Sequence, residues 1–230
     1  NLTYVQALEW LANRYGIEIE RRAIRRRPGE LEQRINEQYE VAEWGCKKFQ
    51  KWLINDGLGS KGLDYLQVRG VSPELIEHYR LGFAPDAFNA ITDSAKQENI
   101  SREILRKVGL ISITQRRRYG THYYDFFRDR VMFPITDARG RVIGFGGRLL
   151  PSDQEDKKQF PKYVNSPESN IFKKGSTFFG LFQAIRAIRQ EGKVYLVEGY
   201  MDVLAFASVG IFNVVSLNGT ALRENAVREL

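Results

Sequence analysis

The spacing of apolar residues changes along this chain, from a helical repeat in the first half to strand-length runs in the second. Between residues 31 and 53, apolar side chains recur every three or four positions, which is typical of one face of a long helix. From residue 130 onward the apolar runs are short and end at turn residues, as strands do. The sequence therefore predicts an α+β fold, with a mainly helical N-terminal part over residues 30–129 and a strand-rich basic part over residues 130–190.

A shorter helix carries clear signals at its ends. Ser72 followed by Pro73 is a typical helix start, because serine caps a free amide and proline has no amide to satisfy. We expect this helix to extend to Tyr79 and to stop at Gly82, because glycine tolerates a left-handed backbone. A further helix is expected over residues 101–107.

Residues 131–135 and 141–145 predict the two strands of a β-hairpin, because both are strand-length apolar runs and turn residues separate them. Gly144, Gly146 and Gly147 do not have the spacing of a dinucleotide-binding fingerprint. We interpret these glycines as sites of a bulge or of close backbone approach.

The end of the chain has the pattern of a β-α-β unit. A strand is expected over residues 193–197, a helix over residues 199–208 that stops at Gly210, and a second strand over residues 211–217. Two strands joined by a helix are expected to be parallel, with a right-handed connection.

Two carboxylates stand at the start of that helix. Glu198 follows the first strand directly, at the sheet edge where open parallel sheets bind ligands, and Asp202 lies four residues later. Both side chains would be within reach of one hydrated magnesium ion. The alternative is structural, because acidic residues also stabilise the positive end of a helix without binding a metal.

The positive charge of the chain is concentrated in one stretch. The formal net charge is +7, and residues 116–174 hold 13 Lys or Arg against 7 Asp or Glu. Cations interleaved with aromatic rings suit single-stranded nucleic acid, although the rings could instead pack in the core while the cations face solvent. The residues of this pattern are Arg116, Arg117, Arg118, Tyr119, Tyr123, Tyr124, Phe126, Phe127, Arg128, Arg130, Arg148, Lys162, Tyr163, Lys173 and Lys174.

Several other sites are excluded. Cys46 is the only cysteine, so the sequence contains no internal disulfide and no cysteine-based zinc site. His78 and His122 are isolated and lack companions at metal-ligand spacing. The one long uncharged run, residues 203–222, is interrupted by Gly210, and no membrane span is predicted.

Five segments then occur in a recognisable order. They are residues 128–135, 140–148, 161–168, 172–175 and 197–202. The first four closely resemble successive motifs of bacterial DnaG-type DNA primases. The fifth resembles the first motif of the Toprim fold, which those primases share with topoisomerases and certain nucleases. Residues 65–85 also resemble the helical stretch of the primases.

This resemblance implies an enzyme that makes short RNA primers on single-stranded DNA from ribonucleoside triphosphates during replication. It implies that Glu198 is catalytic and coordinates or orients Mg²⁺ (or Mn²⁺), with Asp202 as its acidic neighbour. The implied location is the cytoplasm, in the replisome, or an organelle if the source is eukaryotic. The residues expected to bind nucleic acid or nucleotide are Arg128, Arg130, Arg148, Lys162, Tyr163, Asn165, Lys173 and Lys174.

The resemblance also implies a domain organisation. Residues 1–29 would be the linker or helix that follows a missing zinc domain, the only place where zinc is expected, and residues 191–230 would begin a Toprim fold. The sequence stops before the Asp-x-Asp pair of the family, so we expect a fragment that is weak or inactive by itself. The replicative helicase would bind through a missing C-terminal domain. Asn218, directly before Gly219-Thr220, departs from the family pattern.

Two other functions stay open at this point. One is a non-catalytic module that binds single-stranded DNA, and the other is a Toprim nuclease or topoisomerase relative. The segment over residues 161–168 argues against the second alternative, because it resembles primases in particular.

Overall fold

The computed structural model describes residues 29–55, 57–116, 120–151 and 160–218. The chain divides into two units, residues 1–33 and residues 34–230, and the features discussed below belong to the second. Most of the linker predicted over residues 1–29 lies outside the described residues, as do Arg117, Arg118, Tyr119 and the Gly219-Thr220 pair.

The predicted helices are confirmed in type and approximate extent. Ser72 and Ser101 act as the N-caps of α4 and α6, each accepting a hydrogen bond of 3.4 Å from the amide three residues later. No helix among the described residues has the length and apolar character needed to cross a membrane. The helices are α2 (Glu30–Ile54), α3 (Ser60–Val68), α4 (Pro73–His78), α5 (Ala90–Gln97), α6 (Arg102–Lys107), the 3₁₀ turn η1 (Lys174–Ser176), α8 (Leu181–Glu191) and α9 (Tyr200–Ser208).

The described strands form three sheets. The four-stranded central sheet has the antiparallel order β1-β4-β5-β6, and β2 pairs with β3 as a separate hairpin. In the third sheet, of order β7-β9-β8, the parallel pairing of β8 with β9 confirms the predicted β-α-β unit. The strands are β1 (Gly82–Ala84), β2 (Ile111–Arg116), β3 (Gly120–Asp125), β4 (Arg130–Thr136), β5 (Val142–Leu149), β6 (Tyr163–Asn165), β7 (Phe178–Phe179), β8 (Tyr195–Val197) and β9 (Val214–Leu217).

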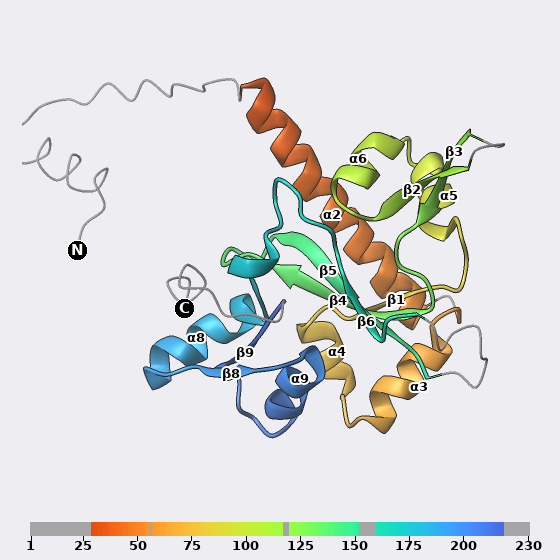
Figure 1. Ribbon diagram of the computed structural model, residues 1–230. Coiled ribbons are helices and arrows are strands. Elements are labelled where there is room, and N and C mark those ends of the chain that lie inside the picture. The colour runs from red at the N-terminus through yellow and green to blue at the C-terminus, as the bar shows by residue number, and fades with distance from the viewer. Residues whose placement is uncertain (1–28, 56, 117–119, 152–159, 219–230) are drawn as a thin grey trace, which may run out of the picture. The chain divides into compact units, whose positions relative to one another are not determined.

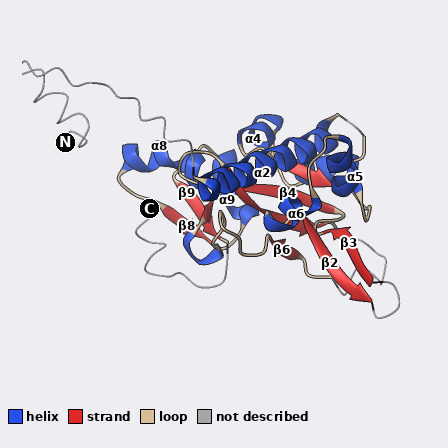
Figure 2. Ribbon diagram, turned by 90° about the horizontal axis from the view of Figure 1, so that it is seen from above, coloured by secondary structure: helices blue, strands red, loops and turns tan. Residues whose placement is uncertain are grey.

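The central sheet is covered on both faces, and every residue of β4 is buried. Met132 belongs to the cluster formed with α2, while Val131 and Phe133 belong to the cluster formed with α9, as the alternation of side chains along a strand requires. Figure 1 shows α2 crossing the sheet. In both Figure 1 and Figure 2, the β2–β3 hairpin lies at the opposite end of β4 from β8 and β9.

Two features of the N-terminal part differ from the prediction. Strand β1 and the β2–β3 hairpin lie within the region expected to be mainly helical, and Gly82 is not the helix stop. Helix α4 ends at the cap residue Tyr79, and Arg80 takes the left-handed conformation with φ 56°. Gly82 instead begins β1, where an added Cβ would stand 2.5 Å from the Cβ of Phe49. The glycine is needed there for close packing of α2 against the sheet.

The glycines of β5 also serve close packing, which confirms our interpretation of them. An added Cβ at Gly147 would approach Phe127 to 2.8 Å, and one at Gly146 would overlap the ring of Tyr200. The contact between Gly146 and Tyr200 brings the first turn of α9 directly onto the central sheet.

Asp125 joins the β2–β3 hairpin to the start of α5. Its side chain is 2% exposed and accepts hydrogen bonds from the amides of Ile91 (2.7 Å) and Thr92 (3.1 Å), and from the hydroxyl of Thr92 (2.7 Å). We expect Asp125→Ala to lower the free energy of unfolding by about 2–3 kcal/mol, because buried donors lose their acceptor. Urea unfolding measures this change. Asp93→Ala, which removes an exposed carboxylate from the same helix, should change stability by less than about 0.5 kcal/mol; equal losses would contradict the prediction.

Candidate active site

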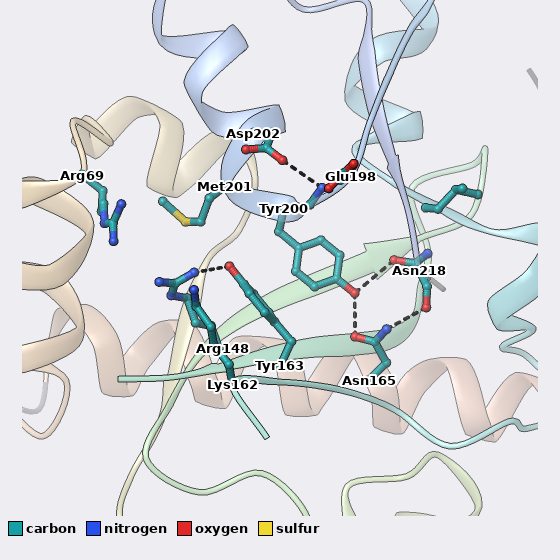
Figure 3. Close-up of a pocket in the computed structure, with 12 residues that line it drawn as sticks. Arg69, Arg148, Lys162, Tyr163, Asn165, Glu198, Tyr200, Met201, Asp202 and Asn218 are labelled. Atoms are coloured by element: carbon teal, nitrogen blue, oxygen red, sulfur yellow. Dashed lines mark hydrogen bonds between the residues drawn. The ribbon is translucent and has the colours of Figure 1, made fainter. Parts of the chain in front are cut away.

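One pocket lies where β6, at the edge of the central sheet, meets the start of α9 and the end of β9. Its volume is about 550 Å³, which is within the range of ligand-binding sites. We call it the Glu198 pocket. The residues that line it are Arg69, Arg148, Lys162, Tyr163, Asn165, Glu198, Gly199, Tyr200, Met201, Asp202, Leu217 and Asn218. Figure 3 shows Glu198 and Asp202 above the rings of Tyr163 and Tyr200, with Arg148 beside the ring of Tyr163.

Glu198 and Asp202 form the acidic wall of the pocket. Strand β8 ends at Val197 and α9 begins at Tyr200, so Glu198 stands in the connection between them, as the sequence predicted. Both carboxylates are exposed and line the pocket. Asp202 also accepts a hydrogen bond of 3.0 Å from the amide of Gly199 through Oδ2. The helix-capping role is therefore confirmed for Asp202, while metal binding by the two residues stays a prediction.

The acidic wall offers a metal ion two carboxylates. No group of three or more His, Cys, Asp or Glu side chains that could hold a metal ion occurs among the described residues. Two carboxylates on one pocket wall still suit Mg²⁺ or Mn²⁺. Magnesium is commonly held by one or two carboxylates together with water and substrate phosphates, and it prefers oxygen ligands. Glu198 and Asp202 are thus the described residues that would hold such an ion.

Arg148 is the central cation of the opposite wall. It is 6% exposed, donates a hydrogen bond to the hydroxyl of Tyr163, and lies over the rings of Tyr65 (5.0 Å) and Tyr163 (5.1 Å). Its buried Nε has no hydrogen-bond partner in the described part of the chain. None of the ion pairs between described side chains involves Arg148. A guanidinium held rigidly by two rings, with donor capacity left over, is suited to an anion in the pocket.

Two further cations complete this basic wall, which we define as Arg69, Arg148 and Lys162. Lys162 is exposed and precedes β6, and Arg69 is the cap residue that ends α3, with its guanidinium over Tyr65 at 5.5 Å. Arg69 was not predicted as a site residue. The only signal was its position inside the segment that resembles the helical stretch of the primases.

The predicted Asn165 faces other protein groups in the pocket floor. Its Nδ2 donates to the backbone oxygen of Asn218 at 2.7 Å, and its Oδ1 accepts from the hydroxyl of Tyr200 at 2.6 Å. Tyr200 and Asn218 were not predicted as site residues. Asn218 stood out in the sequence only as a departure from the family pattern.

Arg130 is not among the residues that line the Glu198 pocket. It is 5% exposed and donates hydrogen bonds to the backbone oxygens of Gly147 (3.2 Å), Pro161 (3.0 Å) and Lys162 (3.4 Å). Burial lowers the pKa of Arg130 to about 10, so the side chain remains protonated at neutral pH. The guanidinium therefore ties the segment that carries Lys162 to β5. Its predicted contact with nucleic acid stays a prediction.

Arg128 stands beside two other pockets. Its guanidinium lies 4.1 Å above the ring of Phe88, which is 66% exposed. Both side chains line a pocket of about 700 Å³ beside the β2–β3 hairpin and one of about 450 Å³ beside Phe160. An exposed ring under a cation is the arrangement expected for stacking an unpaired base.

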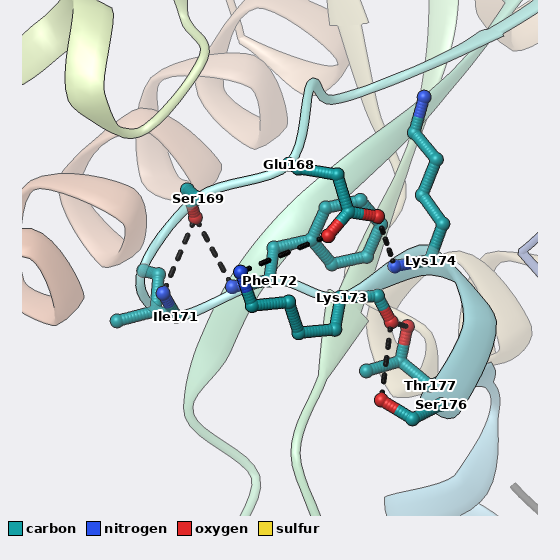
Figure 4. Close-up of polar contacts among 8 residues, drawn as sticks. All are labelled: Glu168, Ser169, Ile171, Phe172, Lys173, Lys174, Ser176 and Thr177. Atoms are coloured by element: carbon teal, nitrogen blue, oxygen red, sulfur yellow. Dashed lines mark hydrogen bonds and ion pairs between the residues drawn. The ribbon is translucent and has the colours of Figure 1, made fainter.

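Lys173 and Lys174 also lie outside the lining of the Glu198 pocket. Glu168 organises their turn, because its Oε1 accepts from the Lys174 amide at 2.8 Å while its Oε2 lies 3.8 Å from the Lys173 ammonium group. Figure 4 shows the side chain of Lys174 extending away from these contacts, with its ammonium group free of the turn.

The aromatic residues of the basic stretch divide between the two interpretations. Phe127 is 3% exposed and packs in the core, whereas Tyr123 and Tyr163 are each 36% exposed. The core interpretation is thus right for some rings and wrong for others.

Two family models and curated relatives match this chain. A family model described as the N-terminal domain of the DNA primase catalytic core matches residues 49–185, and a Toprim-like model matches residues 195–230. A DNA primase of Halalkalibacterium halodurans is 37% identical over 227 residues, which cover 98% of this chain and 36% of the relative. The chain thus spans about a third of the length of this curated relative.

Solved structures give the same result. The structure of a DnaG primase catalytic domain bound to ssDNA is similar with a TM-score of 0.72 and 35% identity, over 85% of this chain and 58% of that chain. The Aquifex aeolicus primase, solved with its zinc-binding and RNA polymerase domains, has a TM-score of 0.72 and 35% identity, over 98% of this chain and 50% of that chain.

Proposed function

This chain belongs to the family of bacterial DnaG-type DNA primases, and on that premise we propose that the Glu198 pocket is part of a primer-synthesising active site. The natural protein would join ribonucleoside triphosphates into short RNA primers on single-stranded DNA. One observation carries the proposal. Three cations and two carboxylates, delivered by separate elements of the fold, face each other across one pocket.

The charges of the two walls indicate the kind of substrate. Arg69, Arg148 and Lys162 favour an anion such as a phosphate chain, but Glu198 and Asp202 would repel a bare phosphate. The charges of both walls are favourably paired when a divalent cation lies between the carboxylates and the phosphates. A nucleoside triphosphate with Mg²⁺ or Mn²⁺ meets this requirement, since the metal ion supplies charge neutralisation of the phosphates when bound.

Each charged residue of the pocket would have a distinct role. Glu198 and Asp202 hold the metal ion, and the rigid guanidinium of Arg148 orients a phosphate group through its remaining N–H donors. Lys162 adds an exposed positive charge to the same wall. Charge that develops on phosphate oxygens during transfer is stabilised by such preplaced cations.

Single-stranded DNA is the proposed template. The basic excess over residues 116–174 supports this, as does the cation above the exposed ring at Arg128 and Phe88. Lys173 and Lys174 stay in the proposal as further phosphate contacts. The relative whose structure is described as bound to ssDNA supports the same ligand class for this chain.

The whole protein would act in the replication machinery of the cytoplasm, in keeping with its bacterial relatives. A zinc domain in the natural protein is proposed by analogy with the Aquifex aeolicus primase. Binding of a replicative helicase is likewise part of the proposal.

The direct test is a primer-synthesis assay with the natural full-length protein. Labelled ribonucleotides should be incorporated into short, alkali-labile products that depend on single-stranded DNA template. We expect a metal chelator to abolish incorporation, and added Mg²⁺ or Mn²⁺ to restore it. Binding of single-stranded DNA without incorporation would favour the non-catalytic binding module, and metal-dependent DNA cleavage would favour a Toprim nuclease. Either result would overturn the proposed function.

A further inference from the structure

The hydroxyl group of Tyr200 lies at the centre of a buried polar network beneath the Glu198 pocket. Tyr200 is 4% exposed and Asn218 is 1% exposed. The hydroxyl lies 2.6 Å from Oδ1 of Asn165 and 3.2 Å from Oδ1 of Asn218, and Nδ2 of Asn165 donates to the backbone oxygen of Asn218 at 2.7 Å. Figure 3 shows these three side chains converging below the acidic wall.

The network joins segments that are distant in the sequence. Asn165 ends β6 of the central sheet, Tyr200 begins α9, and Asn218 follows β9 of the third sheet. Nδ2 of Asn218 also donates to Oγ1 of Thr177 at 3.1 Å, and that hydroxyl donates to the backbone oxygen of Lys173 at 2.9 Å. The network therefore ties two sheets and the Lys173 turn together at one point.

The aromatic ring of Tyr200 is held as firmly as its hydroxyl. It stacks on Phe133 with ring centroids 5.0 Å apart and an interplanar angle of 22°, and it meets Phe179 edge to face at 5.0 Å. The missing side chain of Gly146 makes room for it on β5. The hydroxyl carries a single hydrogen, which it donates to the nearer acceptor, Oδ1 of Asn165.

The position of Tyr200 gives this network a consequence for the proposed active site. Tyr200 lies two residues after Glu198 and two before Asp202, within the first turn of α9. Its ring also contacts that of Tyr163 at 6.0 Å, and Tyr163 in turn accepts the hydrogen bond of Arg148. Tyr200 therefore lies in the turn that carries the acidic wall and also contacts Tyr163, which holds Arg148 of the basic wall.

We propose that Tyr200 is a positioning residue, whose hydrogen bond to Asn165 sets the distance between the acidic wall and the basic wall. This inference rests on the proposed primase function and deepens it. A hydrogen bond across two sheets can hold a turn in place more tightly than ring packing alone, because it has a preferred length and direction. Loss of the bond would let the carboxylates shift while the pocket residues all remain present.

The test is Tyr200→Phe in the natural full-length protein. Phenylalanine keeps the ring contacts and removes only the hydroxyl. We expect kcat for primer synthesis to fall about 10-fold or more, because a small misplacement of reacting groups is costly. The KM for template and the Kd for single-stranded DNA should stay within about twofold of the unaltered protein. Amide hydrogen exchange over residues 198–202 should accelerate relative to that of β4.

Tyr79→Phe is the matched control. Tyr79 is also buried, at 1% exposed, and packs against the same Phe179 ring at 5.6 Å, but its hydroxyl has no hydrogen-bond partner among the described residues. We expect this variant to keep the unaltered kcat. In a second arm, Tyr200→Phe combined with Asn165→Leu should reduce kcat by less than the product of the two single effects, because each single variant already loses the hydrogen bond between these two residues.

The outcomes separate this inference from the proposed function. If the unaltered protein makes no primers, the proposed function fails. If it makes primers and Tyr200→Phe retains the unaltered kcat, or if the effects of Tyr200→Phe and Asn165→Leu multiply, the positioning role is wrong. An equal loss of kcat in Tyr200→Phe and Tyr79→Phe would also overturn it, since that would indicate general destabilisation.

Discussion

Glu198→Gln is expected to abolish primer synthesis while leaving the affinity for single-stranded DNA nearly unchanged. The amide has almost the shape of the carboxylate, so α9 and the pocket should keep their structure. The negative charge that faces the basic wall is lost, and with it the proposed metal ligand. Several kcal/mol of lost charge stabilisation corresponds to a rate roughly 100-fold to 1000-fold lower. Primer synthesis at saturating template and Mg²⁺ measures the effect.

Two comparisons make this prediction specific. Glu77→Gln removes an exposed carboxylate from α4, outside the lining of the pocket, and should leave the rate unchanged. Direct Mn²⁺ binding, followed by electron paramagnetic resonance, should weaken in Glu198→Gln but not in Glu77→Gln. Full primer synthesis by Glu198→Gln would show that the pocket is assigned wrongly.

The second large effect is expected for Arg148→Ala combined with Lys162→Ala. These residues supply two of the three cations of the basic wall. Charge-assisted hydrogen bonds contribute about 1.5–3 kcal/mol each, so the loss of two should lower the affinity for phosphate-bearing ligands roughly 100-fold or more. Fluorescence anisotropy with single-stranded DNA and the KM for ribonucleoside triphosphates together show which ligand contacts these residues.

Salt dependence identifies the cause of the loss. If both residues contact template phosphates, the slope of log K against log salt should become shallower by about 1.4 for a single strand. Lys47→Ala combined with Lys107→Ala removes the same charge from α2 and α6, outside the pocket lining, and should leave the slope unchanged. Affinities for DNA and nucleotide that match the unaltered protein across the salt range would refute the basic wall as a phosphate site.

Local patterns of the sequence correctly predicted many of the elements. The apolar repeat over residues 31–53 became α2, and the two capping serines begin α4 and α6 as expected. These predictions succeeded because helix periodicity and capping depend on residues only three or four positions apart. The same is true of the short connection that makes β4 and β5 neighbours.

Among the strands that were missed, β1 depends on a distant partner. Strand β1 has three residues, and it exists because Gly82 and Phe83 pair with Met132 and Val131 of β4. A segment this short has no alternation to detect, and its pairing free energy comes from a strand almost fifty positions later. Gly82 was assigned to the wrong role for the same reason, since the Phe49 side chain that demands a glycine there is not near it in the sequence.

By itself, the sequence determined several of the helices, the β4–β5 hairpin, the final β-α-β unit, the acidic pair at the start of the last helix and the concentration of positive charge. Each of these is a property of neighbouring residues. Only the tertiary structure decided which cations face Glu198, because Arg69, Arg148 and Lys162 come from separate elements. It also turned Arg130 inward, since a guanidinium buried beneath β5 must find carbonyl partners. Pairing between distant strands, which local patterns do not encode, thus made one pocket from charges scattered along the chain.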